Sequence, residues 1–229
     1  LYSTANDATP VLARLASGDW VGAAAYRGFI GTFTVGSGGA ESYVLRRPYQ
    51  AGSGGEGAIA QAATGSLLTD PFELAAKLRD GKHDDPVLGA LAAYAYARAG
   101  AIDEVRRTTF FYGYYSQPAP FDAVLLARVP IERDAAGYWA AIPAVPARDC
   151  RSPSERTRAW TYEATPPIRV RVGGGFPWLR QGWALLEDDF RPEFRKLFRY
   201  AGALRPSTFT TLAPEAGEEL ASKLKRGEL

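Results

Sequence analysis

The chain has 229 residues, of which 46% are hydrophobic and 23% are charged, and its formal net charge at neutral pH is +2. These values are typical of a folded globular protein and exclude a disordered chain. So small a net charge gives no long-range field that would favour nucleic acid, and no apolar run reaches the roughly 20 residues of a membrane-spanning helix. We therefore expect no nucleic-acid partner and no membrane segment.

Cysteine and methionine usage bears on the compartment and on the extent of the chain. Cys150 is the only cysteine, so there is no internal disulfide framework, which favours the cytoplasm. The sequence contains no methionine, even at position 1, and it does not open with a secretory signal. We expect it to be a piece of a larger intracellular protein. Its high arginine, alanine and glycine content indicates a GC-rich genome rather than a function.

The first fifty residues are rich in aromatic and β-branched residues between glycine breaks. This pattern predicts strands over 20–26, 28–35 and 41–47. The Gly-Ser-Gly-Gly stretch at 36–39 predicts a hairpin turn between the last two, because glycine supplies the positive φ that such turns require. The expected result is a small N-terminal antiparallel sheet.

From residue 58 onward the signals are mostly helical. Two Asp-Pro pairs each place an acidic N-cap residue before a proline at the first helical position. They predict helices over 70–81 and 85–100. Asp103 is predicted to cap a third helix, which must end before Pro118.

The remainder of the chain mixes irregular and helical segments. Frequent prolines make 129–167 extended or irregular, and alternating apolar and basic residues predict a strand over 168–172. Further helices are predicted over 122–128, 177–187, 192–200 and 214–225. The fold class is therefore α+β, with a small N-terminal antiparallel sheet packed against a mostly helical C-terminal portion. We expect a single domain over 1–229, with a soft boundary at 51–57 between strand-rich 1–50 and mostly helical 58–229.

Two glycine-rich stretches could present backbone amides to an anion. The first satisfies the dinucleotide-binding spacing G-x-G-x-x-G, but no βαβ unit follows it, so a linker is the simpler interpretation. The second precedes a predicted helix and is equally explained by a strand-to-helix turn. The candidate anion-binding residues are Gly52, Gly54, Gly57, Gly173, Gly174 and Gly175. A small-ligand or nucleotide-binding module is thus an alternative function, although we expect no bound cofactor.

Cysteine-dependent hydrolysis would need Cys150 and His83, since these are the only thiol and the only imidazole. His83 lies among three aspartates that helix caps explain more simply than a metal site or a catalytic base. Arg148 and Arg151 flank Cys150 and favour its thiolate, but no oxyanion-hole motif surrounds it. We expect no catalytic centre and no metal, with the Cys150–His83 hydrolase as an alternative.

The densest aromatic stretch lies at 110–115 in the third predicted helix. Only part of a helix faces the core, so some of these rings should reach the surface, where tyrosine is favoured at interfaces. The candidate interaction residues are Phe110, Phe111, Tyr112, Tyr114 and Tyr115. Packing beneath the N-terminal sheet is an equally good explanation of the stretch.

Two resemblances add to these patterns. Residues 92–107 (AAYAYARAGAIDEVRR) resemble the inter-helix turn of a tetratricopeptide repeat, but a single copy indicates an ordinary helical hairpin. Three scattered segments resemble the non-catalytic region that follows caspase-like peptidase domains in bacterial multidomain proteins. They are 85–94 (DPVLGALAAY), 121–127 (FDAVLLA) and 176–186, with FPWL at its start and GWALL at its end. The resemblance implies a regulatory or substrate-recruiting module, so our leading expectation is a non-catalytic interaction module. Its partner would be another protein or another part of the same polypeptide.

Overall fold

The computed structural model describes residues 7–48, 70–135, 137–151, 153–187 and 191–228. Within these ranges strands and helices combine into an α+β fold, which confirms the predicted fold class. The predicted glycine-rich boundary at 51–57 lies outside the described residues. No helix in the described ranges is long and apolar enough to reach across a bilayer.

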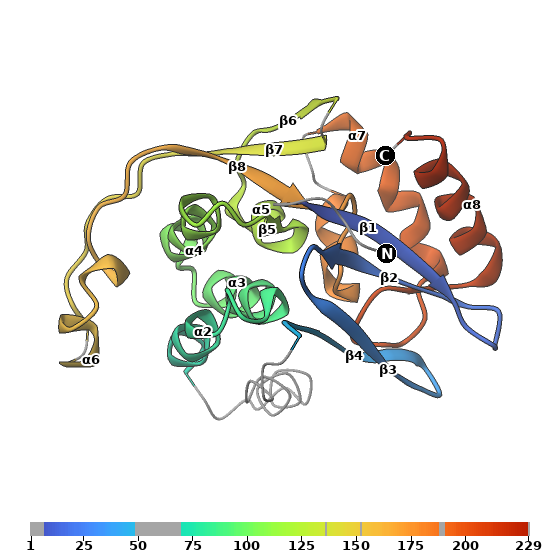
Figure 1. Cartoon of the computed structure of the whole chain (residues 1–229), viewed down its shortest axis with the longest axis horizontal. Coiled ribbons are helices and arrows are strands. Elements are labelled where there is room, and N and C mark those ends of the chain that lie inside the picture. Colours follow the sequence, from blue (N-terminus) through green and yellow to red (C-terminus); the bar gives the residue numbers. More distant parts are fainter. Residues whose placement is uncertain (1–6, 49–69, 136, 152, 188–190, 229) are drawn as a thin grey trace.

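Four strands form the N-terminal part of the fold (Figure 1). They are β1 (Ala8–Arg14), β2 (Trp20–Tyr26), β3 (Ile30–Gly36) and β4 (Gly39–Arg46). The predicted strands and the β3–β4 hairpin are confirmed, and the short strand β9 (Thr211–Leu212) pairs with β2 on the side opposite β1. Strand β1 was not predicted. It contains Pro10 and is an edge strand, where proline is tolerated.

Four helices follow in the middle of the chain. They are α2 (Pro71–Asp80), α3 (Pro86–Arg98), α4 (Ile102–Tyr114) and α5 (Phe121–Ala127). The two Asp-Pro starts are confirmed, since Asp70 and Asp85 accept hydrogen bonds from the backbone N–H groups two residues later. The assignment of Asp103 as a cap was wrong. The N-cap of α4 is Ala101, which makes no side-chain cap bond, and Asp103 lies within the first turn.

Besides the sheets β1-β2-β9 and β3-β4, a third sheet has the strand order β5-β8-β7-β6. Its strands are β5 (Ala119–Pro120), β6 (Ile131–Asp134), β7 (Gly137–Ile142) and β8 (Ile168–Gly173). Strand β8 was predicted, whereas β6 and β7 lie in the stretch that was expected to be extended or irregular. Residues 143–167, here called the arm, leave β7 and return as β8 after extending along the helices to the left in Figure 1. The arm carries the short helices α6 (Pro153–Arg156) and η1 (Ala159–Thr161).

The C-terminal segment contains several short helices and one longer one. They are the 3-10 helix η2 (Arg180–Leu186), α7 (Pro192–Arg195), the 3-10 helix η3 (Lys196–Ala203) and α8 (Pro214–Lys225). Helix α8 was predicted with these bounds. The helix expected over 177–187 is a 3-10 helix that starts later, because the backbone N–H groups of Trp178 and Leu179 bind a side chain instead of continuing a helix.

The buried apolar side chains form one cluster to which sheets and helices both contribute. Trp178 lies at its centre, with no exposed surface, and makes edge contacts with the rings of Tyr26 and Tyr43 at centroid distances of 5.7 and 6.5 Å. The Tyr43 hydroxyl donates to the Ala24 carbonyl at 2.9 Å, which ties β4 to β2. The strands and the helices are therefore joined by common core contacts.

Candidate functional site

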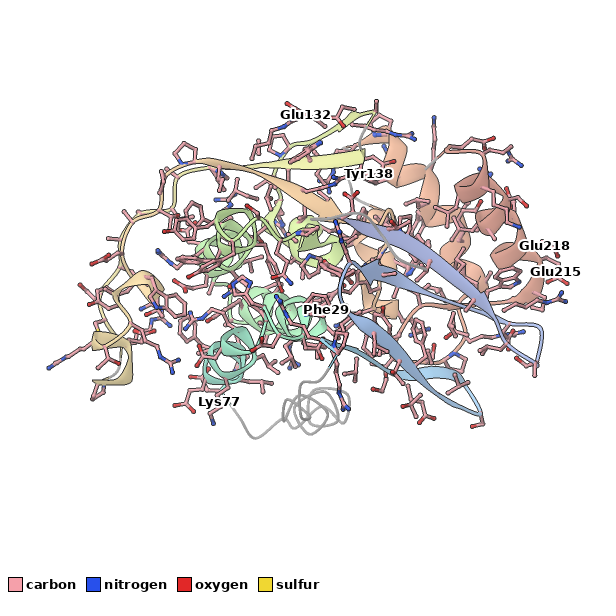
Figure 2. All side chains as sticks on the ribbon, viewed as in Figure 1. Phe29, Lys77, Glu132, Tyr138, Glu215 and Glu218 are labelled. Atoms are coloured by element: carbon pink, nitrogen blue, oxygen red, sulfur yellow. The ribbon has the colours of Figure 1, made fainter. Side chains whose placement is uncertain are left out.

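A cleft of about 610 Å³ lies between the N-terminal strands and helices α2 to α4. Phe29, labelled in Figure 2, lies at this junction. Several separate segments form the walls: the β2–β3 connection, the residue after β4, the α2–α3 loop and the turn that follows α4. The side chains that matter for its chemistry are Arg27, Phe29, Arg47, His83, Tyr115 and Gln117.

The turn after α4 has an unusual backbone. Ser116 has φ of 55°, a left-handed conformation that a residue other than glycine adopts rarely. Its N–H donates to the Gly113 carbonyl at 2.9 Å, and the N–H of Gln117 donates to the Tyr112 carbonyl at 2.8 Å, so the pair closes the helix end. This reversal directs Gln117 toward the α2–α3 loop.

Gln117 holds His83 through two hydrogen bonds. Its Oε1 lies 2.7 Å from His83 Nδ1, and its Nε2 donates to the His83 carbonyl at 3.4 Å. Since Oε1 is an acceptor, Nδ1 carries the proton and Nε2 keeps a lone pair, which is buried and has no hydrogen-bond partner among the described residues. Burial, together with the nearby Lys82 ammonium, lowers the pKa of His83 to about 4, so the ring is neutral at pH 7.

The cleft holds a serine and a histidine, but their arrangement favours binding over nucleophilic catalysis. A general base is most effective when its pKa lies near the working pH, and His83 lies well below it. Its Nε2 accepts no hydrogen bond from Ser116 or from any other described residue. The described residues also contain no group of three or more His, Cys, Asp or Glu side chains arranged as metal ligands.

The charges at the rim of the cleft are mainly positive. The exposed guanidiniums of Arg27 and Arg47 form no ion pair with the described residues, whereas the Asp7 carboxylate is paired with Arg171. The Arg47 guanidinium lies over the Phe29 ring at 5.0 Å from the centroid. The rim thus combines cationic groups with an aromatic face.

The five aromatic candidates at 110–115 divide between core and surface. Phe110, Phe111 and Tyr112 are buried, so these three pack inside the fold. Tyr114 and Tyr115 are each 61% exposed, which agrees with the expectation that some rings of this stretch reach the surface. The Tyr115 ring also makes an edge contact with His83, at a centroid distance of 4.8 Å, and so borders the cleft.

A third exposed ring, Trp160 of the arm, extends this surface. Its side chain is 38% exposed and makes an edge contact with Phe111 at 5.4 Å, and Phe111 in turn contacts Tyr114 and Tyr115. We call Tyr114, Tyr115 and Trp160 the aromatic surface. The Lys82 ammonium lies beneath it, 5.6 Å from the Phe111 centroid and 5.5 Å from the Trp160 centroid.

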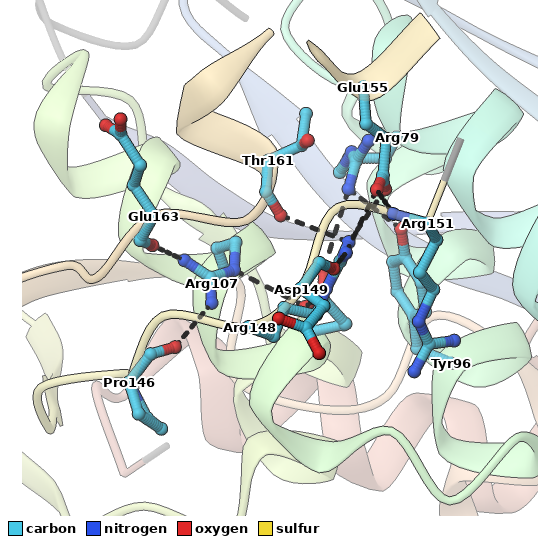
Figure 3. A network of polar contacts seen from close by, with 11 residues as sticks. Arg79, Tyr96, Arg107, Pro146, Arg148, Asp149, Arg151, Glu155, Thr161 and Glu163 are labelled. Atoms are coloured by element: carbon cyan, nitrogen blue, oxygen red, sulfur yellow. Dashed lines mark hydrogen bonds and ion pairs between the residues drawn. The ribbon is translucent and has the colours of Figure 1, made fainter. Parts of the chain in front are cut away.

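The arm is attached to the helices by a buried network of charges (Figure 3). Glu104 in the first turn of α4 is 3% exposed and accepts from Arg148 of the arm at 2.7 Å. Arg148 also binds Glu155 at 2.7 Å and the Thr161 carbonyl at 3.2 Å. Arg107 of α4 donates to the Pro146 carbonyl at 2.8 Å. These contacts fix the position of Trp160.

The structure does not support a catalytic pair of Cys150 and His83. Cys150 follows closely after Arg148, which binds Glu104 at the start of α4, whereas His83 packs against Tyr112 in the last turns. Eight residues of helix separate these two anchor points, or about 12 Å at a rise of 1.5 Å per residue. Arg148, two residues before Cys150, and His83 therefore contact different ends of α4.

Three of the glycine candidates lie within the described residues. Gly173 ends β8, and Gly174 and Gly175 follow it, with Gly174 at φ of +90°. The N–H groups that follow, of Trp178 and Leu179, donate to the buried Asp122 carboxylate at 2.7 and 3.2 Å. These two N–H groups are thus already bonded to a carboxylate of the chain itself. Gly52, Gly54 and Gly57 lie outside the described residues.

Comparison with known proteins gives no relative. No protein family matches the chain, and no curated protein or solved structure is detectably similar to it. Function therefore has to be argued from the site alone, and the resemblance to caspase-associated regions stays a prediction.

Sequence reasoning did not find most of the cleft. Arg27, Phe29 and Gln117 belong to no motif, and they meet only because the hairpin and the end of α4 fold together. The local signals were the single histidine and the aromatic stretch at 110–115, which includes Tyr115. Trp160 stood in a stretch without a predicted element, so nothing indicated that it would adjoin the tyrosines.

Proposed function

We propose that this chain is a non-catalytic interaction module that binds an extended segment of a protein partner along the aromatic surface and into the cleft. The observation that carries the proposal is the pair of tyrosines, each 61% exposed, beside a cleft of about 610 Å³. Exposed aromatic rings of this kind are frequent at binding surfaces, because their apolar bodies gain from burial while their hydroxyls tolerate water.

The rigidity of the surface supports the same function. Tyr114 and Tyr115 belong to the end of α4, and the charge network around Glu104 fixes the arm that carries Trp160. Anchors that are already held in place lose little conformational entropy when a partner binds. The neutral His83 and its partner Gln117 form part of the cleft wall without adding charge.

The resemblance to regions that follow caspase-like peptidase domains suggests a setting for this function. In that setting the module belongs to a larger intracellular, cytoplasmic bacterial protein and recruits a substrate to the protease or regulates it. The coding sequence upstream of the chain tests this part: a caspase-like domain is expected there, and an unrelated domain would contradict it. The binding proposal itself does not depend on this result.

Selection from a peptide library tests the binding function directly. A phage library of random peptides of about twelve residues is panned on the full chain, and enriched peptides are synthesised with a fluorescent label for polarisation measurements. Because a few central aromatic residues carry most of the energy at such surfaces, Tyr114→Ser with Tyr115→Ser is expected to weaken binding by about 10-fold or more.

The matched control is Leu185→Ser, which changes an exposed apolar residue of η2 outside the aromatic surface and the cleft. It is expected to bind the peptides like the unmodified chain. The proposal fails if no peptide is enriched, or if the enriched peptides bind the tyrosine double variant as tightly as the control.

A further inference from the structure

Arg27 and Arg47 at the cleft differ from the arginines of the charge network that attaches the arm to the helices. The buried Arg79 and Arg107 and the partly buried Arg148 all lie near the Glu104 carboxylate, because cations removed from water need a compensating charge. Arg27 and Arg47 are exposed, and among the described residues their guanidinium N–H groups make no hydrogen bond and no ion pair. Ten N–H donors in two guanidiniums are thus available to a ligand at this rim.

Other groups at the cleft leave this positive charge uncompensated. The nearest cleft carboxylate, Asp7, is paired with Arg171, and His83 is neutral. The charges that act on His83 include the cations Lys82 and Arg47, both of which lower its pKa, and the exposed Asp84, which opposes them. The field in the cleft therefore favours a negatively charged ligand.

We infer that the partner segment is acidic, with Asp or Glu carboxylates on Arg27 and Arg47 and an apolar side chain between Phe29 and Tyr115. This inference rests on the proposed function and specifies the chemistry of the bound peptide. Guanidinium matches carboxylate through paired N–H···O bonds, and Arg47 is held beside the Phe29 ring, so its position is partly fixed before binding. A basic or uncharged segment would leave both guanidiniums unpaired.

Three pools of labelled peptides test this inference. All have the same central tryptophan and the same neutral spacers, and they differ only at the flanking positions, which hold Asp and Glu, Asn and Gln, or Lys. The acidic pool is expected to bind the full chain about 10-fold more tightly than the amide pool at low salt, and the preference should shrink as salt rises. The lysine pool is expected to bind most weakly.

Charge reversal identifies the residues that are responsible for the preference for acidic peptides. Arg27→Glu with Arg47→Glu is expected to remove the acidic preference and to favour the lysine pool. Arg14→Glu with Arg180→Glu changes the net charge equally, at exposed arginines outside the cleft, and should keep the preference. Circular dichroism checks that both double variants fold.

The outcomes separate this inference from the proposed function. If the tyrosine double variant loses binding but the unmodified chain does not prefer acidic peptides, the inference is wrong and the interaction module stands. If no pool binds although peptides selected from the library do, the inference is wrong and the interaction module stands; if neither the pools nor any library peptide binds, the interaction module itself is wrong. A labelled single-stranded DNA that binds the chain more tightly than the acidic pool, through the same two arginines, would assign the cleft to nucleic acid and overturn the inference.

Discussion

A single buried carboxylate, that of Asp122, links three elements that are distant in sequence. It accepts from the backbone N–H groups of Trp178 and Leu179, before η2, and from the Tyr94 hydroxyl of α3 at 2.8 Å. Burial raises its pKa to about 6, and the three hydrogen bonds oppose this rise. Burial of the Asp122 carboxylate thus has a desolvation cost, and its hydrogen bonds with three buried donors offset that cost.

Replacing Asp122 with asparagine tests this balance. The amide NH2 would face one of the three donors, so we expect Asp122→Asn to lower the free energy of unfolding by about 1–3 kcal/mol in urea denaturation at neutral pH. The folded pKa lies above that of the unfolded chain, so ionisation costs stability as the pH rises through about 4 to 6. The free energy of unfolding of the unmodified chain should thus exceed that of Asp122→Asn by more at about pH 5 than at about pH 7. Glu132→Gln, an exposed control, should change little.

His83 should give a pH dependence of the opposite sign. Its folded pKa, about 4, lies below the ordinary value of 6.5, so the unfolded chain binds more protons between these values. The contribution of His83 to the free energy of unfolding is therefore lost as the pH falls from about 6.5 toward 4. The urea midpoint of the unmodified chain should fall further than that of His83→Gln between about pH 7.5 and 5. Equal decreases would mean that His83 titrates normally.

Ser116 carries backbone strain that glycine would relieve. Its φ of 55° disfavours a residue with a Cβ atom, and glycine is the usual residue at this position after a helix. Ser116→Gly is expected to raise the free energy of unfolding by up to about 1 kcal/mol in thermal denaturation. Decreased stability would instead show that the serine side chain makes a contact that outweighs the strain.

At the scale of elements, the attachment of the arm depends on Arg148. Replacing it with methionine removes the contacts of the arm with Glu104 and Glu155 while retaining most of the apolar volume. We expect Arg148→Met to increase the rate of tryptic cleavage after Arg151, Arg156 and Arg158 by about 10-fold, because cleavage follows local opening. Arg169→Met, which breaks exposed ion pairs and a contact with the Trp139 ring, all outside the arm, should leave these rates unchanged.

The elements that the sequence predicted well carry strong local signals. The Asp-Pro pairs fixed the starts of α2 and α3, and the glycine-flanked pattern of β2 matched its bounds. Strand β6 has one partly buried residue followed by three exposed ones, so no alternation marked it as a strand. The cleft was not predictable for another reason. Arg27 and Gln117 lie 90 residues apart, and only long-range packing brings them to one wall.

At the scale of the whole molecule, one buried cluster includes residues of all three sheets and of helices α2 to α5. Trp178 and Trp183 lie fully within it, so their fluorescence reports the core, whereas far-ultraviolet circular dichroism reports the helices. If the single-domain prediction is right, both signals should give the same urea midpoint. Two separated transitions would instead indicate that the strand-rich and helical parts unfold independently.

The pairing of β7 with β8 has a consequence for engineering. Ile142 and Ile168 are paired in the antiparallel register of β7 and β8. The two strands therefore meet at the base of the arm, and the arm is the connection of a long hairpin. The entropy of closing such a loop grows slowly with its length, and a doubling costs only about 0.6 kcal/mol. The arm is therefore a natural place for grafting: a shorter turn would give a minimal scaffold without Trp160, and a longer insert could carry a new binding loop beside the tyrosines.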